Sequence, residues 1–360
     1  MKRIFFVHLL NDYSGSPKVL SQVIAAVKQK HNVELFNGKS KEGFLTDCVE
    51  KHHQYYYKWF DNKLLTLVSF VLSQIFLFFK IINRRNFFDI IYINTMLPFG
   101  AALAGKFAGK EVIYHIHETS IKPEIFKHFL RWIIRKTADK IIYVSASLRE
   151  EESFVDINDN IIFNCLDQKF LSKAEINLIE PKVAKGFNVL MICSLKAYKG
   201  VEEFVAVAKK CDGLGINFNL ILNADSHQIE QYFSNSNLPS NLKIKGKQSD
   251  VHHFYANSNI LLNLSRPDQW VETFGLTIIE AMAYGIPVIV PPVGGPAEIV
   301  RDGVEGFLIS SYDTSSIVDK INELFNNKVK YDQLSKNAFK RASDFDEETF
   351  RKEILQVINE

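Results

Sequence analysis

The chain has 360 residues, 47% of them hydrophobic, which is enough for two globular domains with separate cores. Its 43 basic and 41 acidic residues give a net charge of +2, so global charge does not indicate a polyanion partner such as nucleic acid. The four cysteines form no CxxC pair, and the first residues lack the long apolar region of a signal peptide. We therefore expect a reduced, cytoplasmic protein.

Short apolar runs alternate with amphipathic stretches along the chain, which predicts parallel sheets covered by helices on both faces. In the N-terminal half the predicted strands are Arg3–Leu9, Ile90–Asn94, Glu111–Ile116 and Lys140–Val144. In the C-terminal half they are Asn188–Cys193, Asn217–Asn223, Leu242–Lys245, Ile260–Leu264, Pro287–Val290 and Gly306–Ile309. The clearest helical patterns are Lys18–Lys30, Val201–Cys211 and Leu276–Ala283.

A polar segment with neither helical nor strand periodicity separates the two sets of strands. We expect an N-terminal domain at 1–168, a linker at 169–185 and a C-terminal domain at 186–340. The remaining residues, 341–360, predict a C-terminal helix.

Two stretches of the N-terminal half bear on membrane contact. LLTLVSFVLSQIFLFFK, from Leu64, predicts an apolar helix of about sixteen residues, shorter than the roughly 20 residues of an ordinary span. We interpret it as a helix packed in the N-terminal domain, with membrane insertion as the alternative. The stretch 121–140 predicts a basic amphipathic helix with Phe129 and Trp132 on its apolar face. Contact with anionic lipid and burial with a solvated rim both explain that pattern.

The stretch VETFGLTIIEAMAYGIPVIVPPVGG, residues 271–295, places Glu272 and Glu280 eight residues apart around a Phe-Gly pair. The surrounding pattern is strand, polar loop and helix, with the helix beginning near Gly275. Such loops lie beyond the carboxyl ends of parallel strands, where ligands bind, and a helix N-terminus suits a phosphate. Each carboxylate can accept hydrogen bonds from vicinal hydroxyls. The motif therefore predicts a nucleotide-sugar site, with ribose at one end and a hexose at the other.

The segments ETFGLTIIEAMAYGIPVI and VGGPAEIVRDGVEGFLI resemble the signature of the retaining GT-B glycosyltransferases of family 4, also called glycosyl transferases group 1. SLKAYKGVEEFV, YHIHE and IFNCLD resemble further segments of the same family. The resemblance is strong from Phe187 to Ile309 and weak before Ile90. It implies an α/β GT-B architecture, in which two Rossmann-like domains have parallel sheets that face across a cleft. The N-terminal domain would bind the acceptor, the C-terminal one would bind the nucleotide sugar, and the last helix would cross back to the N-terminal domain.

The resemblance also implies roles for the residues of the C-terminal motif. Glu272 would contact the hexose hydroxyls, helped by the backbone N–H groups of Phe274 and Gly275. Glu280 would bind the ribose hydroxyls. The backbone N–H groups contacting the diphosphate would be those of Leu276 and Thr277.

The matching residues outside that motif are Lys199, His117, Gly15 and Ser16. Lys199 would neutralise the leaving diphosphate in place of a metal, so we expect no divalent cation and no cofactor. His117 would face the sugar across the cleft, while Gly15 and Ser16 would form the loop that approaches donor phosphate and acceptor.

One departure from the family is Ser194, which stands where an arginine is usual. One cation of the pyrophosphate clamp is then missing, unless Lys196 or Arg266 substitutes. The resemblance implies retaining transfer of a hexose from a nucleotide diphosphate sugar to a glycan or lipid-linked acceptor, as in surface polysaccharide or lipopolysaccharide biosynthesis. Peripheral contact with an anionic membrane would suit such an acceptor. The alternatives are a nucleotide-sugar epimerase on the same fold, and a non-catalytic nucleotide-sugar-binding subunit, which Ser194 favours.

Overall fold

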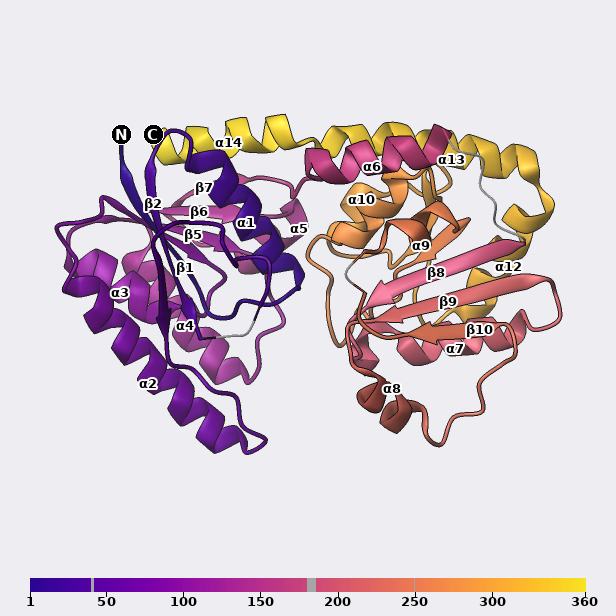
Figure 1. Cartoon of the computed structure of the whole chain (residues 1–360), viewed down its shortest axis with the longest axis horizontal. Helices are drawn as coiled ribbons and strands as arrows, with labels where there is room; N and C mark the ends of the chain where they lie inside the picture. Colours follow the sequence, from indigo (N-terminus) through magenta and orange to yellow (C-terminus); the bar gives the residue numbers. More distant parts are fainter. Residues whose placement is uncertain (40–41, 180–185, 249) are drawn as a thin grey trace. The chain divides into compact units, whose positions relative to one another are not determined.

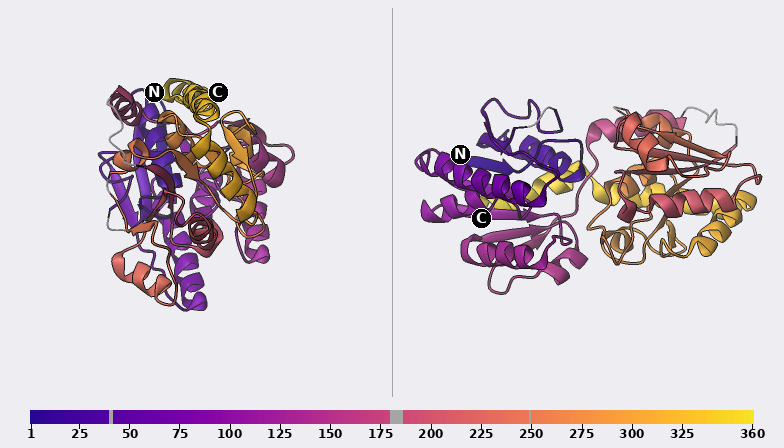
Figure 2. Two further views of the ribbon diagram at one scale, coloured as in Figure 1. Left: turned by 90° about the vertical axis from the view of Figure 1, so that its right-hand side faces the viewer. Right: turned by 90° about the horizontal axis from the view of Figure 1, so that it is seen from below.

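The computed structural model describes residues 1–39, 42–179, 186–248 and 250–360 (Figure 1). The chain forms two compact units: unit 1 comprises Met1–Asn164 and Glu348–Glu360, and unit 2 comprises Cys165–Glu347. Each unit has one parallel sheet with helices on both of its faces, as Figure 2 shows. The predicted α/β class with two Rossmann-like sheets is confirmed.

The sheet of unit 1 has seven strands in the order β3-β2-β1-β4-β5-β6-β7. These strands are β1 Arg3–His8, β2 Asn32–Gly38, β3 His52–Tyr55, β4 Ile90–Asn94, β5 Glu111–Ile116, β6 Lys140–Tyr143 and β7 Asn158–Ile161. The four strands predicted in this half are present within one residue of their expected ends. The prediction missed β2, β3 and β7, because asparagine, histidine, glutamine and acidic residues make up much of their sequences, NVELFNG, HHQY and NDNI.

The helices of unit 1 are α1 Gly15–Val27, α2 Lys63–Ile82, α3 Phe99–Phe107, α4 Glu124–Thr137, α5 Ala146–Glu152 and α14 Glu347–Asn359. The expected length of about sixteen residues for the apolar helix is wrong, since α2 has 20 residues. Its own terminal residues extend it, because Asn62 caps its first turn by accepting hydrogen bonds from the N–H groups of Leu64 and Leu65. In unit 1, α14 is held by Lys140, whose Nζ donates to the Val357 carbonyl at 2.9 Å.

The sheet of unit 2 has six strands in the order β10-β9-β8-β11-β12-β13. All six were predicted, and they are β8 Phe187–Cys193, β9 Ile216–Leu222, β10 Leu242–Lys245, β11 Ile260–Leu262, β12 Val288–Val290 and β13 Gly306–Leu308. The order reverses between β8 and β11, so the loops that follow these two strands diverge and leave room for a ligand.

The helices of unit 2 include two short 3-10 turns, η1 and η2. In chain order they are α6 Gln168–Ile179, η1 Ala197–Lys199, α7 Val201–Lys210, α8 Ser226–Phe233, α9 His252–Ala256, α10 Leu276–Ala283, α11 Gly295–Ile299, α12 Thr314–Asn326, α13 Lys328–Ala342 and η2 Ser343–Phe345.

The expected linker at 169–185 is wrong over its described part, where α6 is a regular helix of unit 2. Phe170 and Ala174 of α6 are buried, and the Phe170 ring lies 4.5 Å from that of His252 on α9. Within residues 168–176 these two, at i and i+4 spacing, are the only buried side chains, and the polar residues around them hid the helical period. Residues 180–185 lie outside the described residues. The boundary expected after 340 also falls inside a helix, because α13 continues to Ala342.

Candidate active site

Lys199 and Glu272 form an ion pair at the reversal point of the unit 2 sheet. Lys199 ends η1, just after β8, and Glu272 lies in the loop between β11 and α10. The Lys199 Nζ lies 2.5 Å from Glu272 Oε2, and the two side chains are 17% and 20% exposed. Ser265 Oγ also lies 3.4 Å from the same carboxylate oxygen. The structure thus brings together the two unit 2 residues for which catalytic roles were expected.

Glycine allows the chain on either side of this pair to approach closely. Gly200, directly after Lys199, has φ of +80°, and a Cβ there would lie 2.0 Å from the Leu264 carbonyl oxygen. Only glycine therefore fits here, between η1 and the start of the loop that follows β11.

The N-terminus of α10 lies beside Glu272. Gly275 precedes the helix with φ of +100°, and a Cβ there would lie 2.6 Å from Ile278 Cδ1. Leu276 and Thr277 occupy the first turn, where backbone N–H groups have no acceptor within the helix. The Phe274 side chain is buried, and its ring packs edge-on against Phe345 at 5.8 Å.

The Gly294–Gly295 turn of the motif packs against the backbone of the Glu272 loop. The Gly295 N–H donates to the Glu272 carbonyl at 2.9 Å. A Cβ on Gly294 would lie 2.4 Å from that same carbonyl oxygen, and one on Gly295 would lie 2.3 Å from the Thr273 carbonyl oxygen. Both glycines are therefore required for the close contact that positions Glu272.

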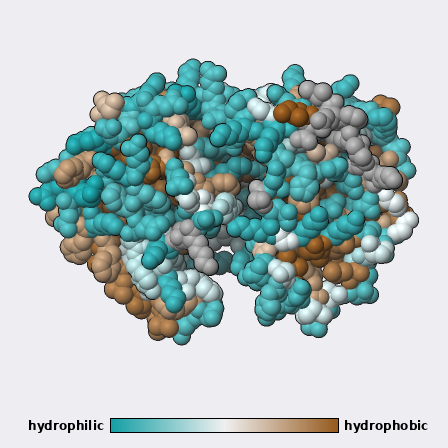
Figure 3. Space-filling model, in the orientation of Figure 1, coloured by the Kyte–Doolittle hydropathy of each residue, from teal (hydrophilic) through white to brown (hydrophobic). Residues whose placement is uncertain are grey.

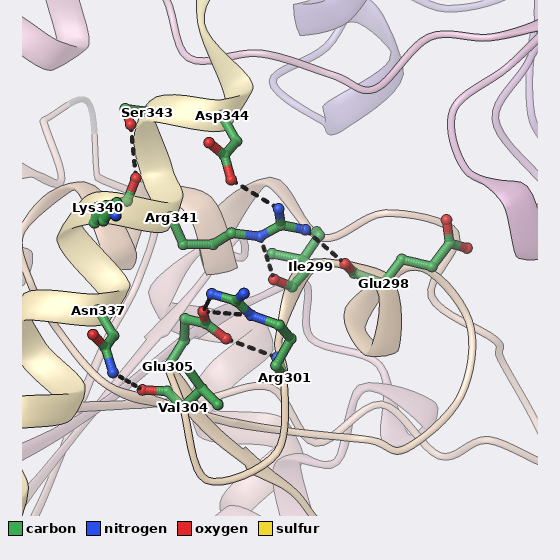
Figure 4. Close-up of polar contacts among 10 residues, drawn as sticks. All are labelled: Glu298, Ile299, Arg301, Val304, Glu305, Asn337, Lys340, Arg341, Ser343 and Asp344. Carbon is green, nitrogen blue, oxygen red and sulfur yellow. Dashed lines mark hydrogen bonds and ion pairs between the residues drawn. The ribbon is translucent and has the colours of Figure 1, made fainter.

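Helix α13 fixes the chain that follows this turn, a relationship that sequence reasoning missed (Figure 4). The Arg341 guanidinium donates to the carbonyls of Ile299 at 3.0 Å and Glu298 at 2.9 Å, at the end of α11. Asn337, one turn earlier on α13, donates to the Val304 carbonyl at 3.0 Å. Arg341 and Asn337 are far from the motif in sequence, so no local signal marked them.

Glu280 is 7% exposed and lies one turn into α10. Its carboxylate accepts a hydrogen bond from the Tyr255 hydroxyl of α9 at 2.7 Å. Burial, followed by the Glu280 carboxylate, raises the pKa of Tyr255 well above its ordinary value, so this phenol stays a donor. Tyr255 was not identified from the sequence. Glu280 therefore has a different partner from Glu272, which pairs with Lys199.

An aromatic pair lies beside Lys199 and was also missed. The Trp270 ring stacks on Tyr198 with centroids 5.0 Å apart, and the Lys199 Nζ lies 5.5 Å from the Trp270 centroid. A cation near an indole face is attracted to its negative surface. Trp270 therefore helps to hold Lys199 in place.

Arg266 does not fill the place of the missing family arginine. Its Nε donates to Glu203 at 2.8 Å and its Nη2 pairs with Glu202, so α7 already neutralises its charge. Its neighbour Asp268 likewise accepts a hydrogen bond from the Tyr312 hydroxyl at 2.6 Å. Lys196 is exposed and stays the candidate second cation.

In unit 1, polar side chains meet where β1, β4 and β5 end. His117 Nε2 lies 2.9 Å from Asn94 Oδ1, and Asn94 Nδ2 donates to the Ser16 carbonyl at 3.1 Å. His8 Nδ1 lies 3.2 Å from Asn94 Nδ2. Gly15 is exposed in the first turn of α1. Asn94, which sequence reasoning missed, thus connects two of the expected unit 1 site residues.

Burial sets the protonation of this cluster. It lowers the pKa of His117 well below its ordinary value, helped by His115 and His8, and it lowers the pKa of His8 to about 4. Next in the chain, Glu118 accepts from the Met96 N–H at 2.7 Å, while burial raises the pKa of its carboxyl to about 7. At neutral pH the histidines are neutral, so they act as hydrogen-bond partners rather than as cations.

Comparison with known proteins decides the family. Residues 173–341 match the family of glycosyl transferases group 1, and residues 17–152 match Glycosyltransferase Family 4. The chain belongs to this glycosyltransferase family and has its GT-B fold.

This glycosyltransferase is similar to several proteins over most of its length. It is 27% identical over 288 residues to the N-acetyl-alpha-D-glucosaminyl L-malate synthase of Bacillus anthracis. The matched residues make up 76% of this chain and 73% of that one. The structure of Anabaena HepE in complex with UDP-glucose has a TM-score of 0.78, with 21% identity and all of both chains covered. The lipopolysaccharide outer core galactosyltransferase WaaB gives 0.72, with 19% identity and 99% of both chains covered.

Among the described residues of this glycosyltransferase, no three His, Cys, Asp or Glu side chains are grouped so as to hold a metal ion. The described site residues supply positive charge through the Lys199 ammonium and the first turn of α10.

Proposed function

We propose that this glycosyltransferase transfers a hexose from a nucleotide diphosphate sugar to a hydroxyl of a glycan or lipid-linked acceptor, in the synthesis of a surface polysaccharide. The observation that carries the proposal is the Lys199–Glu272 ion pair beside the first turn of α10. A cation, a hydroxyl-binding carboxylate and free N–H groups are the partners that a sugar diphosphate needs. The structural relatives HepE, bound to UDP-glucose, and WaaB, a galactosyltransferase, support this donor class.

Donor binding would exchange the partners of both charged residues. The diphosphate pairs with the Lys199 ammonium in place of Glu272, while the hexose hydroxyls donate hydrogen bonds to the Glu272 carboxylate. The N–H groups of Leu276 and Thr277 donate to phosphate oxygens, and Glu280 accepts from the ribose hydroxyls beside Tyr255. Before the donor binds, Lys199 and Glu272 compensate each other's charge, so neither charge is left unpaired in the partly buried site.

The proposed chemistry is a substitution at the anomeric carbon with retained configuration. The bond from that carbon to the diphosphate oxygen breaks, the acceptor hydroxyl attacks from the same face, and its proton passes to the departing phosphate. Negative charge develops on the diphosphate as this bond breaks, and the Lys199 ammonium and the positive end of the α10 dipole would stabilise it. A fixed ammonium can perform the task of a divalent cation, so the proposed reaction is metal-independent and needs no cofactor.

We assign the unit 1 cluster of His117, Asn94 and Ser16 to the acceptor side of the reaction. His117 is held at 2.9 Å by Asn94 and is neutral, so it suits hydrogen bonding to a sugar hydroxyl. The expected setting is the cytoplasmic face of a cell membrane, where lipid-linked acceptors are available.

A thermal-shift panel of UDP-, GDP- and dTDP-sugars tests the donor site. A ligand at about 100 times its Kd raises the free energy of unfolding by about 2.7 kcal/mol, which gives a clear increase in Tm. No shift with any member of the panel would contradict the proposal. Incubation with the stabilising donor alone then separates transfer from epimerisation, because an epimerised sugar requires no acceptor.

A further inference from the structure

Helix α2 of unit 1 is apolar on the face that it turns to solvent. Nine large apolar side chains on this face, here called the α2 apolar face, are each at least 40% exposed: Leu64, Leu65, Leu67, Val68, Val71, Leu72, Ile75, Phe76 and Phe79. The same region appears as a brown hydrophobic surface in Figure 3, over the position of α2 in Figure 1. Folded domains seldom expose a contiguous apolar patch of this kind unless something binds it.

The inward face of α2 carries two polar residues among the buried apolar residues Phe70, Leu77, Ile81 and Ile82. Ser73 and Gln74 are buried, and Gln74 Oε1 accepts from the Gly100 N–H of α3 at 3.1 Å. A Cβ on Gly100 would lie 2.1 Å from the Gln74 carbonyl oxygen, so α2 and α3 are in backbone contact. A surface helix normally turns its polar residues outward, whereas the outer face of α2 carries the nine exposed apolar side chains.

Helix α2 is long and apolar enough to cross a membrane by length and composition, and 39% of its most apolar window is buried. The Gln74–Gly100 contact and the hydrogen bond from Lys80 Nζ to the Gln54 carbonyl, at 2.7 Å, join it to the rest of unit 1. A helix that crossed the bilayer would break these contacts. The α2 apolar face can instead enter the bilayer surface sideways while the inner face stays packed.

Positive charge lies at both ends of this apolar face. The segment from residue 56 to residue 88 contains five basic residues and one acidic residue, Asp61. Of the basic residues, Lys58 and Lys63 are exposed before or at the start of α2, and Arg85 is exposed just after its end. Because the whole chain has a net charge of only +2, this segment is locally far more basic than the average.

Amphipathic aromatic residues also lie at the margin. Tyr56 and Trp59 precede α2 and are both 65% exposed. Tryptophan and tyrosine concentrate at the boundary between lipid chains and headgroups. The apolar centre would match the lipid chains, the aromatic margin would match the boundary with the headgroups, and the basic residues would match the anionic phosphates.

We infer that the α2 apolar face docks on the surface of an anionic lipid bilayer, with Leu72 and Phe76 near the centre of the inserted face. This extends the proposed function by giving the enzyme access to a membrane-borne acceptor. The sequence pattern had favoured packing in the N-terminal domain for α2, and had given lipid contact equal weight only for the basic helix 121–140. The structure points to α2, because no other described helix turns so long an apolar face to solvent.

Sedimentation with vesicles tests the inference on the full chain, without any transfer assay, so its outcome is independent of the donor and the reaction. Vesicles of phosphatidylcholine are compared with vesicles that also contain phosphatidylglycerol. We expect the protein to bind the anionic vesicles preferentially, and Leu72→Gln with Phe76→Gln to weaken binding by about tenfold or more. Lys63→Gln with Arg85→Gln should weaken it by about fivefold for each cation removed.

The matched control is Val155→Gln with Val329→Gln, two apolar residues that are 81% and 80% exposed elsewhere. It should bind as the wild type does, and a thermal melt should show that every variant is folded. Failure of the wild type to bind anionic vesicles, or undiminished binding by the Leu72/Phe76 variant, would overturn the inference. So would a wild-type dimer in solution that the same variant dissociates, since a second copy would then occupy the face.

Discussion

The Lys199 ammonium lies 2.5 Å from the Glu272 carboxylate, so the two residues proposed to contact different parts of the donor contact each other. Lys199 follows β8 and Glu272 follows β11, which are adjacent strands, so the pair also connects the two loops of the switch point. A bound donor has to replace this interaction on both sides. The diphosphate must satisfy the ammonium, and the sugar hydroxyls must satisfy the carboxylate.

Replacing Lys199 should impair turnover while the fold stays intact. We expect Lys199→Ala to lower kcat by about 10²–10³, because the charge that stabilises the leaving diphosphate is removed. Steady-state kinetics with a saturating donor measure this effect, and Lys209→Ala, at an exposed position of α7, is the control. An unchanged kcat in Lys199→Ala would show that another cation performs the task.

The two motif glutamates should respond differently to loss of charge. Glu280→Gln should weaken binding of the intact donor and of the free nucleoside diphosphate alike, since both contain the ribose. Glu272→Gln should leave nucleoside diphosphate affinity nearly unchanged and lower the transfer rate. A hydrogen bond to a charged group contributes roughly 1.5–3 kcal/mol, so each effect should be about tenfold or more in calorimetry or kinetics. Equal losses of nucleoside diphosphate affinity in both variants would refute the assignment.

The Gly-Gly turn offers a pair of substitutions to compare. Gly294 and Gly303 have nearly the same φ, +70° and +71°, but Gly294 has a ψ of −159°, a region that only glycine readily adopts, so alanine is strained at Gly294 by its backbone as well as by its contacts. A Cβ on Gly294 meets the Glu272 carbonyl oxygen at 2.4 Å, whereas one on Gly303 meets nothing within 4 Å. Gly294→Ala should therefore displace Glu272 and lower kcat by about a hundredfold, while Gly303→Ala keeps wild-type kinetics. Equal kcat in the two variants would show that the contact does not position Glu272.

The stability of unit 1 should fall on acidification because of buried histidines. Burial lowers the pKa of His115 from 6.5 to about 3, so between these values the unfolded chain binds a proton that the folded chain does not. The free energy of unfolding therefore falls as the pH drops below 6.5, by about 1.4 kcal/mol per pH unit for this residue. His115→Gln should reduce the slope by that amount in urea unfolding between pH 6.5 and 4.5. His128→Gln, at an exposed position of α4, should keep the wild-type slope.

Activity should survive complete removal of divalent cations. The ammonium of Lys199 and the first turn of α10 supply the positive charge that the diphosphate requires. Transfer assays with excess EDTA should give the same rate as untreated enzyme. Loss of activity with EDTA, followed by recovery with magnesium or manganese, would contradict metal independence.

The sequence by itself determined the features that depend on neighbouring residues. Helix α10 and strands β4, β5 and β10 have the predicted bounds, because their apolar runs and flanking turns are local signals. The nucleotide-sugar motif was recognisable for the same reason, since Glu272, Gly275 and Glu280 all lie within nine residues. Strands β2, β3 and β7 were not predicted, because their polar residues break the apolar pattern on which such predictions depend.

Only the tertiary structure decided which distant residues support the site. Arg341 holds the end of α11, Asn94 connects His117 to Ser16, and Arg266 is neutralised by α7 rather than available to a phosphate. These contacts join segments separated by tens of residues, and no local pattern encodes such pairing.

The orientation of α2 was likewise decided by tertiary packing. Its sequence shows an apolar helix, and an apolar helix can be buried or exposed with the same composition. The backbone contact between Gln74 and Gly100 requires a small residue on α3 and fixes which side of α2 faces inward, the side that carries Ser73, Gln74 and Leu77. The larger apolar face then has to point away from the domain, because one helix cannot turn both of its sides to a single neighbour.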